Sequence, residues 1–223
     1  MANPQSVQDK NKRDDKRPMP RLYLVTPVIE DAAAFSGTLR DALAAADVAA
    51  VLLRLKPAGE RDLINRIKML APLVQEKDIA LLLDGVPELV ARAGADGAHL
   101  TGIDVFMAVV DSLKPAKIAG CGGLNSRDDT MLAGERGADY VMMGQVSAGQ
   151  RRLPFDAIVE RIEWWSELFT VPCVGFAASL TEIAPLAAAG ADFVAIGDAV
   201  WNDPRGVRAA LADASRLLAP EPV

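Results

Sequence analysis

The chain has 223 residues, of which 51% are hydrophobic and 24% are charged, and its formal net charge is −6. This length supports one sizeable hydrophobic core, and the composition is ordinary for a globular protein. The negative charge gives no electrostatic reason to bind nucleic acid, and the longest apolar runs fall well below the roughly 18 residues of a membrane span. We therefore expect one domain that binds neither nucleic acid nor a membrane.

The first twenty residues are polar, mix both charge signs and lack the apolar segment of a secretory signal. We expect a disordered tail at residues 1–20 and a single folded domain at residues 21–223. Cys121 and Cys173 each lie in an apolar run, which predicts two buried free thiols. Sparse cysteine and the absence of a signal favour the reducing cytoplasm.

Short β-rich runs alternate with longer helical patterns along the chain, as in a parallel sheet covered by helices. Most of the runs are continuously apolar, which is typical of strands buried on both faces. We predict eight strands: Leu22–Thr26, Ala50–Leu55, Ile79–Leu83, Gly97–Leu100, Lys117–Cys121, Tyr140–Met143, Val171–Gly175 and Phe193–Ile196.

The phrase Gly-Ala-Asp recurs before three of these predicted strands, beginning at Gly94, Gly137 and Gly190. Glycine adopts the left-handed conformation that ends a helix, and Ala-Asp then makes a short turn into the strand. The distance between copies exceeds one strand–helix unit of a compact barrel. It is close to the length of one or two such units together with their loops. The repeat indicates a fold and not a function.

We predict the α/β class and, within it, a single-domain (β/α)8 TIM barrel, since eight strand–helix units in a chain of this length suit a closed barrel. The rival is an open doubly wound sheet, whose cofactor-binding forms carry Gly-x-Gly-x-x-Gly after the first strand. Here the first strand ends in Val25-Thr26-Pro27, and the glycine cluster at residues 120–123 lacks that spacing.

Catalytic groups of such barrels lie at the carboxyl ends of the strands. Arg54 and Lys56 close the second predicted strand, and alternation places them on one face, where two cations suit a phosphate or diphosphate. Alternatively, Arg54 and Lys56 are two solvated charges at the rim, and their spacing favours neither interpretation over the other.

Asp84 and Asp104 follow the third and fourth predicted strands, which are neighbours. Two carboxylates beside two cations can hold Mg2+, which takes oxygen ligands and completes its shell with water and substrate phosphates. The alternative makes each aspartate a helix N-cap, which suits Asp104 better than Asp84.

His99 is the only histidine, and we expect it to be a hydrogen-bonded structural residue rather than a catalyst. No serine has a histidine and an acid in a recognisable arrangement, and no Cys/His cluster suggests a metal centre. Schiff-base aldolase chemistry is disfavoured, because the only lysine at a strand end is Lys56, among expected phosphate ligands.

Five motifs identify a family. These are Tyr-Leu-Val-Thr at residues 23–26, Leu-Leu-Arg-Leu-Lys at 52–56, Leu-Asp at 83–84, Gly-Ala-His-Leu-Thr-Gly-Ile-Asp at 97–104 and Gly-Ala-Asp-Tyr-Val-Met-Met-Gly at 137–144. With them the chain resembles thiamine phosphate synthase and its relatives from about Arg21 to Leu218. The glutamine that opens the family's Gln-Leu-Arg-x-Lys segment is lost here, and so is the asparagine of its Asn-Asp.

The resemblance implies a transferase that joins a pyrimidine diphosphate to a thiazole phosphate and releases pyrophosphate with the help of Mg2+. It implies that Arg54 and Lys56 bind the diphosphate as catalytic residues and that Asp84 and Asp104 hold the metal. The resemblance therefore implies that the partner of this protein is a phosphorylated small molecule.

The other half of the implied substrate site departs from the family pattern. A serine after the fifth strand falls on Gly122, and of the Thr-x-Thr-Lys loop after the sixth strand only a charge survives, at Arg152. A Gly-Gly pair after the seventh strand is Ala177-Ala178, and a phosphate-contacting serine after the eighth is Asp198. Asp198 would repel a phosphate dianion.

Two hypotheses follow. The first is a synthase-type enzyme that is active with altered loops or uses a related, non-phosphorylated acceptor; the second is a catalytically impaired relative that binds a phosphorylated or thiamine-like small molecule. The family's thiazole tautomerase branch is weaker, because its catalytic histidine has no candidate except His99. Trp164 and Trp165 could pack on the barrel or on a second subunit of a homo-oligomer.

Overall fold

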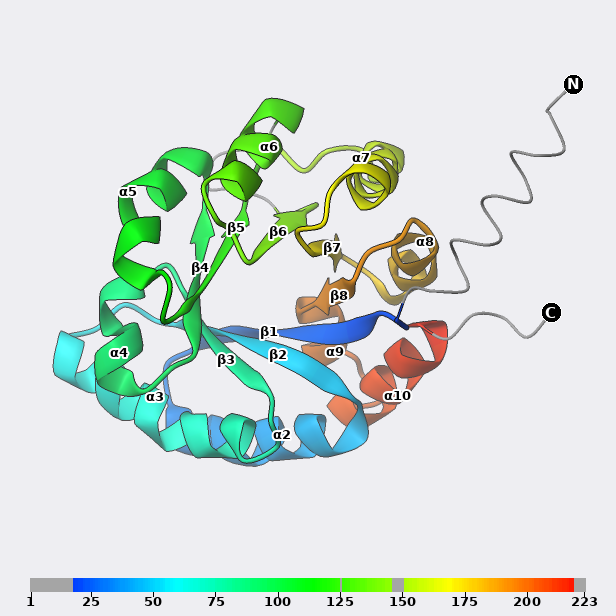
Figure 1. The fold of residues 1–223 in the computed structure, drawn as a ribbon. Coiled ribbons are helices and arrows are strands. Elements are labelled where there is room, and N and C mark those ends of the chain that lie inside the picture. Colours follow the sequence, from blue (N-terminus) through cyan, green and yellow to red (C-terminus); the bar gives the residue numbers. More distant parts are fainter. Residues whose placement is uncertain (1–17, 125, 146–150, 219–223) are drawn as a thin grey trace, which may run out of the picture.

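The computed structural model describes residues 18–124, 126–145 and 151–218 and shows a closed barrel of parallel strands in sequence order (Figure 1). The (β/α)8 barrel is therefore confirmed, and the open sheet is excluded. The strands are β1 (Arg21–Ile29), β2 (Val48–Leu55), β3 (Ala80–Asp84), β4 (Gly97–Thr101), β5 (Ile118–Gly122), β6 (Tyr140–Met143), β7 (Cys173–Ala177) and β8 (Phe193–Ile196).

Helices surround the strands on the outside of the barrel (Figure 1). They are α2 (Ala32–Ala45), α3 (Glu60–Gln75), α4 (Val90–Ala93), α5 (Ile103–Leu113), α6 (Arg127–Glu135), α7 (Phe155–Leu168), α8 (Ile183–Ala188), α9 (Asp198–Trp201) and α10 (Val207–Leu218), with 3-10 turns η1 (Pro87–Leu89) and η2 (Leu180–Glu182). Within the described residues, no helix combines the length and the apolar character that crossing a membrane requires.

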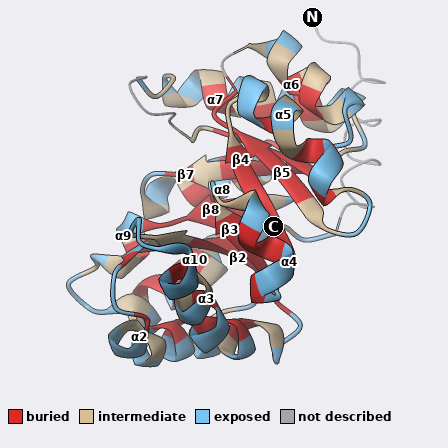
Figure 2. Cartoon of the chain, turned by 90° about the vertical axis from the view of Figure 1, so that its left-hand side faces the viewer, coloured by how far each residue is buried: buried red, intermediate tan, exposed pale blue. Residues whose placement is uncertain are grey.

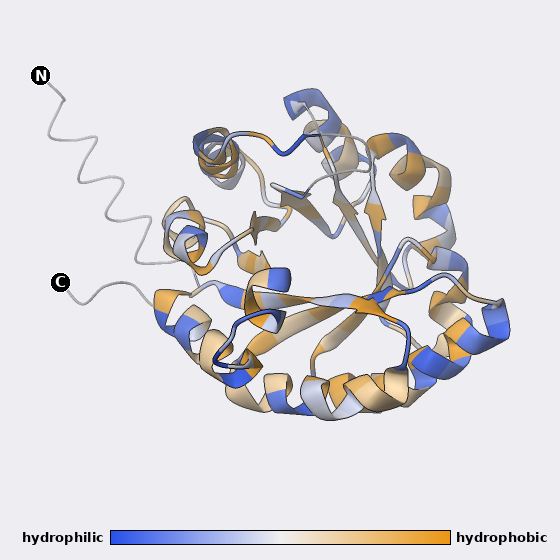
Figure 3. Cartoon of the chain, turned by 180° about the vertical axis from the view of Figure 1, so that it is seen from behind, coloured by the Kyte–Doolittle hydropathy of each residue, from blue (hydrophilic) through white to orange (hydrophobic). Residues whose placement is uncertain are grey.

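The hydrophobic core has two layers. The larger layer lies between the strands and the helices, so buried residues concentrate in the strands and on the inner faces of the helices (Figure 2). Hydrophilic residues accordingly gather on the helices (Figure 3). A smaller cluster fills the barrel and includes Tyr23, Leu82, Tyr140 and Met142. The interior of the barrel is thus packed with side chains, and the catalytic groups of such barrels lie at the rim.

The predicted strands are all present, with bounds that differ at their ends. β1 continues to Ile29 because, beyond an irregularity between Val25 and Val28, it pairs again with the end of β2. β7 starts at Cys173 and not at Val171, since Pro172 has no N–H for the ladder. Most of the tail expected at residues 1–20 lies outside the described residues, and residues 18–20 have no regular structure.

The Gly-Ala-Asp phrases each introduce an even-numbered strand, β4, β6 or β8. Their glycines have φ values of 78°, 88° and 92°, in the left-handed region as expected. Each aspartate carboxylate accepts a backbone N–H from the preceding strand: Asp96 from Leu81, Asp139 from Ala119 and Asp192 from Cys173. One copy therefore spans two strand–helix units, and its aspartate joins the two strands of a pair.

Both cysteines are buried thiols, as predicted. Burial raises the pKa of the Cys121 thiol to about 12, so the thiol stays protonated and unreactive at neutral pH. Trp165 is buried in the core, where its indole N–H donates to the carbonyl of Val171 and its ring stacks on Phe169. Packing of Trp165 on its own barrel is therefore established.

Candidate active site

The residues predicted to form the site all lie at the carboxyl ends of the strands or in the segments that follow them. Because the strands are parallel and the barrel is closed, these ends share one rim. Arg54 and Lys56 lie at the end of β2, Asp84 at the end of β3, Asp104 in the first turn after β4, Gly122 at the end of β5, Arg152 after β6, Ala177 and Ala178 at the end of β7 and Asp198 after β8.

Arg54 and Asp84 are brought together, with 3.9 Å between Arg54 Nε and Asp84 Oδ2. Both side chains are about one-third exposed, at 34% and 30%, so the pair faces the rim without being fully solvated. The backbone N–H of Arg54 donates to the buried hydroxyl of Thr26 at 3.0 Å. Thr26 thus supplies an acceptor at the irregularity of β1 and positions Arg54.

Lys56 takes a different partner. Its Nζ lies 2.8 Å from Glu30 Oε2, beside the end of β1, whereas Arg54 contacts β3 on the other side of its strand. Lysine and glutamate are both more than half exposed, and an ion pair of this kind contributes little to stability. Lys56 can therefore exchange Glu30 for a stronger anion at small cost.

Asp104 is exposed and is the second residue of α5. The N-cap is Gly102, and no side chain caps that helix; Asp84 is followed by Gly85 and not by a helix. The N-cap interpretation of both aspartates is therefore wrong. In the described part of the chain no three His, Cys, Asp or Glu side chains gather as a metal cluster. A site with two protein carboxylates suits Mg2+, which leaves most of its shell to water and substrate phosphates.

His99 is completely buried inside the barrel and hydrogen-bonded through both ring nitrogens. Its Nδ1 lies 2.8 Å from the hydroxyl of Tyr140, and its Nε2 lies 2.7 Å from Gln145 Oε1. Burial lowers the pKa of His99, although Gln145 and Asp84 oppose this effect. The imidazole is neutral at neutral pH, and its structural role agrees with the prediction.

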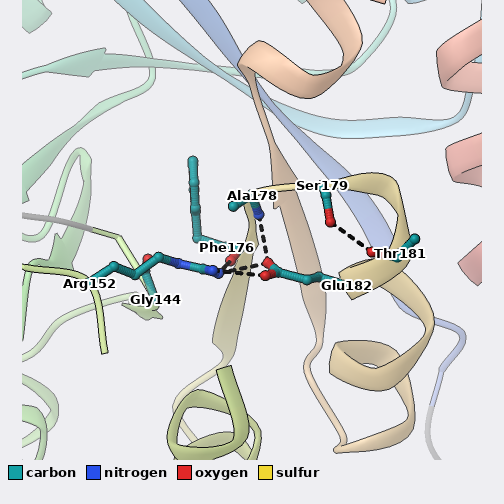
Figure 4. A network of polar contacts seen from close by, with 7 residues as sticks. All are labelled: Gly144, Arg152, Phe176, Ala178, Ser179, Thr181 and Glu182. Carbon is teal, nitrogen blue, oxygen red and sulfur yellow. Dashed lines mark hydrogen bonds and ion pairs between the residues drawn. The ribbon is translucent and has the colours of Figure 1, made fainter. Parts of the chain in front are cut away.

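Arg152 is held by a network that joins the ends of β6 and β7 (Figure 4). Its guanidinium binds both carboxylate oxygens of Glu182, at 2.8 and 2.7 Å, and donates to the carbonyls of Gly144 and Phe176. Glu182 also accepts the backbone N–H of Ala178 at 2.7 Å. The backbone N–H of Ala178 is thus taken by a carboxylate of the chain itself and not left open to a phosphate.

Replacement of Glu182 by glutamine should lower the free energy of unfolding at pH 7 by about 2 kcal/mol, because charge-assisted hydrogen bonds are lost. Burial opposes ionisation of Glu182, but Arg152 and the Ala178 N–H outweigh it and lower its pKa below the usual value of a glutamate. This stabilisation is complete above the ordinary pKa and is lost as the pH falls through the lowered one. Denaturant titrations between pH 7 and 3 should show the variant's deficit shrinking. Glu167→Gln, an exposed carboxylate on α7, is the control; an unchanged deficit at pH 3 would contradict the assignment.

Ala177 and Asp198 differ in exposure. Ala177 ends β7 and is buried, while Asp198 is exposed as the first residue of α9. The loops after the seventh and eighth strands, with a short extra helix, often form a phosphate site in these barrels. Here both loops carry a carboxylate, Glu182 after β7 and Asp198 after β8.

The comparisons with known proteins agree with this geometry. A family model described as thiamine monophosphate synthase matches residues 22–200. The chain belongs to the thiamine-phosphate synthase family. It is 43% identical over 201 residues to a thiamine-phosphate synthase of Rhodospirillum centenum, covering 89% of this chain and 97% of that protein. A thiamine-phosphate synthase of Hyphomonas neptunium is 37% identical, with 87% and 92% covered.

A solved thiamine phosphate pyrophosphorylase of Pyrococcus furiosus has the same fold as this thiamine-phosphate synthase family member. The TM-score is 0.72 at 24% identity, and the match covers 89% of this chain and 95% of that structure. The family and the transferase class predicted from the five motifs are thereby confirmed.

Sequence reasoning missed the residues that hold the candidate site in place. Thr26 is the last residue of the Tyr-Leu-Val-Thr motif, and this motif could have identified it as a site residue. Glu30, Gln145 and Glu182 carry no signal in the sequence, because their partners lie on other strands or loops.

Proposed function

We propose that the protein is a thiamine phosphate synthase that transfers the pyrimidine unit of a pyrimidine diphosphate to a thiazole phosphate and releases pyrophosphate. Membership of the family supports this function. The observation that carries it is the contact of Arg54 with Asp84, at neighbouring strand ends on the catalytic rim of the barrel. A cation and a carboxylate together suit a diphosphate and its metal ion.

Asp84 and Asp104 would hold Mg2+, since they supply carboxylate oxygens after the neighbouring strands β3 and β4. When bound, the ion would supply positive charge near the diphosphate. Arg54 would bind the diphosphate oxygens with its fork of N–H donors, and Lys56 would leave Glu30 to add a second positive charge. As the carbon–oxygen bond to the diphosphate breaks, both electrons leave with the pyrophosphate, and the same carbon forms its new bond to the thiazole phosphate. The positive charges of Arg54 and Lys56 stabilise the negative charge that develops on the leaving group.

The remaining candidates belong to the acceptor side. Arg152, Ala177, Ala178 and Asp198 would line the place of the thiazole phosphate, and Arg152 would have to leave Glu182 to offer its positive charge. The two buried thiols are consistent with the cytoplasm as the place of this reaction.

The residues after β7 and β8 that differ from the family pattern favour one alternative function. In it, the protein is a relative that binds the diphosphate without turnover. The deciding experiment incubates the purified protein with Mg2+ and both substrates and measures thiamine monophosphate. The synthase proposal requires magnesium-dependent product. Binding of pyrophosphate and Mg2+ without any product, beside an active Rhodospirillum centenum synthase, would establish the alternative.

Replacement of Asp198 by serine should lower the KM for the thiazole phosphate about fivefold. An exposed carboxylate about 4 Å from a phosphate charge costs roughly 1 kcal/mol in water. Steady-state kinetics with each substrate varied in turn measure the effect, and the KM for the pyrimidine diphosphate serves as the internal control. An unchanged thiazole KM would mean that Asp198 points away from the acceptor.

A further inference from the structure

Gly122 ends β5 at a place where no side chain fits beside the present neighbours. A Cβ at Gly122 would lie 2.1 Å from Gln145 Oε1 and 2.6 Å from His99 Nε2, far inside van der Waals contact. The family's serine falls on this position. Here the side chain of Gln145, which follows β6, and the ring of His99 together fill the space that a serine side chain would need.

A buried chain of hydrogen bonds leads to Gln145 from the opposite side of the barrel. The hydroxyls of Tyr23 and Tyr140 lie 2.8 Å apart, Tyr140 contacts His99 Nδ1, and His99 Nε2 contacts Gln145. Burial raises the pKa of both tyrosines, so both hydroxyls keep their protons.

The donor-to-acceptor direction of these hydrogen bonds follows from the buried end of the series, at Tyr23. Among the described residues Tyr23 has no other hydroxyl partner, so its proton is donated to Tyr140, and Tyr140 donates to His99 Nδ1. Because Nδ1 accepts, the ring proton of His99 is on Nε2 and is donated to Gln145 Oε1. The opposite direction would leave the proton of Tyr23 buried without an acceptor in this part of the structure, which is costly.

The same chain fixes the orientation of the Gln145 amide. With the oxygen bound to His99, the amide presents its NH2 group, which can only donate hydrogen bonds. Gln145 is partly exposed and directly follows Gly144 at the rim, while its partner His99 pairs with Asp84 in the ladder of β3 and β4. The amide of Gln145 therefore lies between the buried series of hydrogen bonds and the catalytic rim.

We propose that Gln145 is a substrate-binding residue whose NH2 group donates a hydrogen bond to the bound pyrimidine diphosphate, in place of a side chain at Gly122. This assignment rests on the proposed function, because it takes the ligand from there. Tyr23, Tyr140 and His99 are positioning residues, which set the orientation of the amide.

The first test measures binding of the pyrimidine diphosphate with Mg2+ by calorimetry, in the absence of the thiazole phosphate. Gln145→Ala should raise Kd about tenfold, as expected for one lost hydrogen bond. Gln145→Glu keeps an oxygen for His99 but has no N–H donor, and it should raise Kd at least as much. The KM for the thiazole phosphate should stay unchanged in both. Wild-type Kd in the folded Gln145→Glu protein would overturn the proposal.

The second test places a side chain at position 122. Gly122→Ser should weaken binding of the pyrimidine diphosphate, because the new Cβ would lie 2.1 Å from Gln145 Oε1 and 2.6 Å from His99 Nε2 and must displace the amide. Removal of Gln145 leaves the clash with His99, so the double variant Gly122→Ser with Gln145→Ala should bind no more tightly than Gln145→Ala. Wild-type Kd in a Gly122→Ser protein that is folded by thermal melting would overturn the assignment.

These binding measurements separate this inference from the proposed function. Wild-type protein that binds the pyrimidine diphosphate but forms no product would end the synthase proposal, and the variants would still decide the role of Gln145. Wild-type protein that does not bind the pyrimidine diphosphate would overturn both.

Discussion

Replacement of Asp84 by asparagine should lower kcat/KM for thiamine monophosphate formation at least a hundredfold. Asparagine keeps the size of the side chain but removes the negative charge that would hold Mg2+ beside the diphosphate, and losing one preorganised electrostatic group costs about a hundredfold or more. Initial rates across a range of Mg2+ concentrations measure the effect. The apparent Mg2+ requirement should rise, and thermal stabilisation by pyrophosphate with Mg2+ should disappear.

Asp111→Asn is the matched control for this variant. Asp111 is an exposed aspartate on α5, the helix that carries Asp104. Its replacement changes the net charge equally and should leave rates and Mg2+ dependence at wild-type values. Asp84→Asn protein with the rate and Mg2+ dependence of Asp111→Asn would remove Asp84 from the metal site.

Replacement of Arg54 by alanine should weaken the binding of pyrophosphate with Mg2+ about thirtyfold or more. A hydrogen-bonded charge pair with a phosphate is worth about 1.5–3 kcal/mol, and Arg54 can offer two parallel N–H donors. Arg54→Lys should recover only part of the affinity, because an ammonium group lacks the planar fork. Calorimetric titration of the three proteins gives the comparison.

Arg66→Ala provides the control for Arg54→Ala. Arg66 lies on α3 and donates to the carbonyl of Lys56, so it is a nearby arginine that we do not place in the site. We expect its removal to change pyrophosphate affinity less than threefold. Equal losses in Arg54→Ala and Arg66→Ala would show a general effect of charge and would contradict a specific role of Arg54.

The barrel could be predicted because each strand–helix unit carries local signals that agree. Continuous apolar runs mark strands buried on both faces, and Gly94, Gly137 and Gly190 mark the helix ends that precede β4, β6 and β8. What the sequence could not show is the use of the following aspartates. Their carboxylates join neighbouring strands through backbone N–H groups, which is a tertiary contact.

The placement of the candidate site could also be predicted, since the carboxyl ends of parallel strands meet on one rim. The pairing of its charges could not. Alternation placed Arg54 and Lys56 together, yet Arg54 contacts Asp84 at the end of β3, and Lys56 contacts Glu30, which follows β1. The sequence likewise gives no indication that Arg152 is bound to Glu182. These partners depend on how loops distant in the chain meet at the rim.

A structure determined with Mg2+ and pyrophosphate tests the central claim most directly. We predict that the ion is bound by Asp84 and Asp104, that pyrophosphate contacts it and the guanidinium of Arg54, and that Lys56 has left Glu30. Pyrophosphate bound away from the ends of β2 and β3, or a metal ion with neither aspartate among its ligands, would contradict the account.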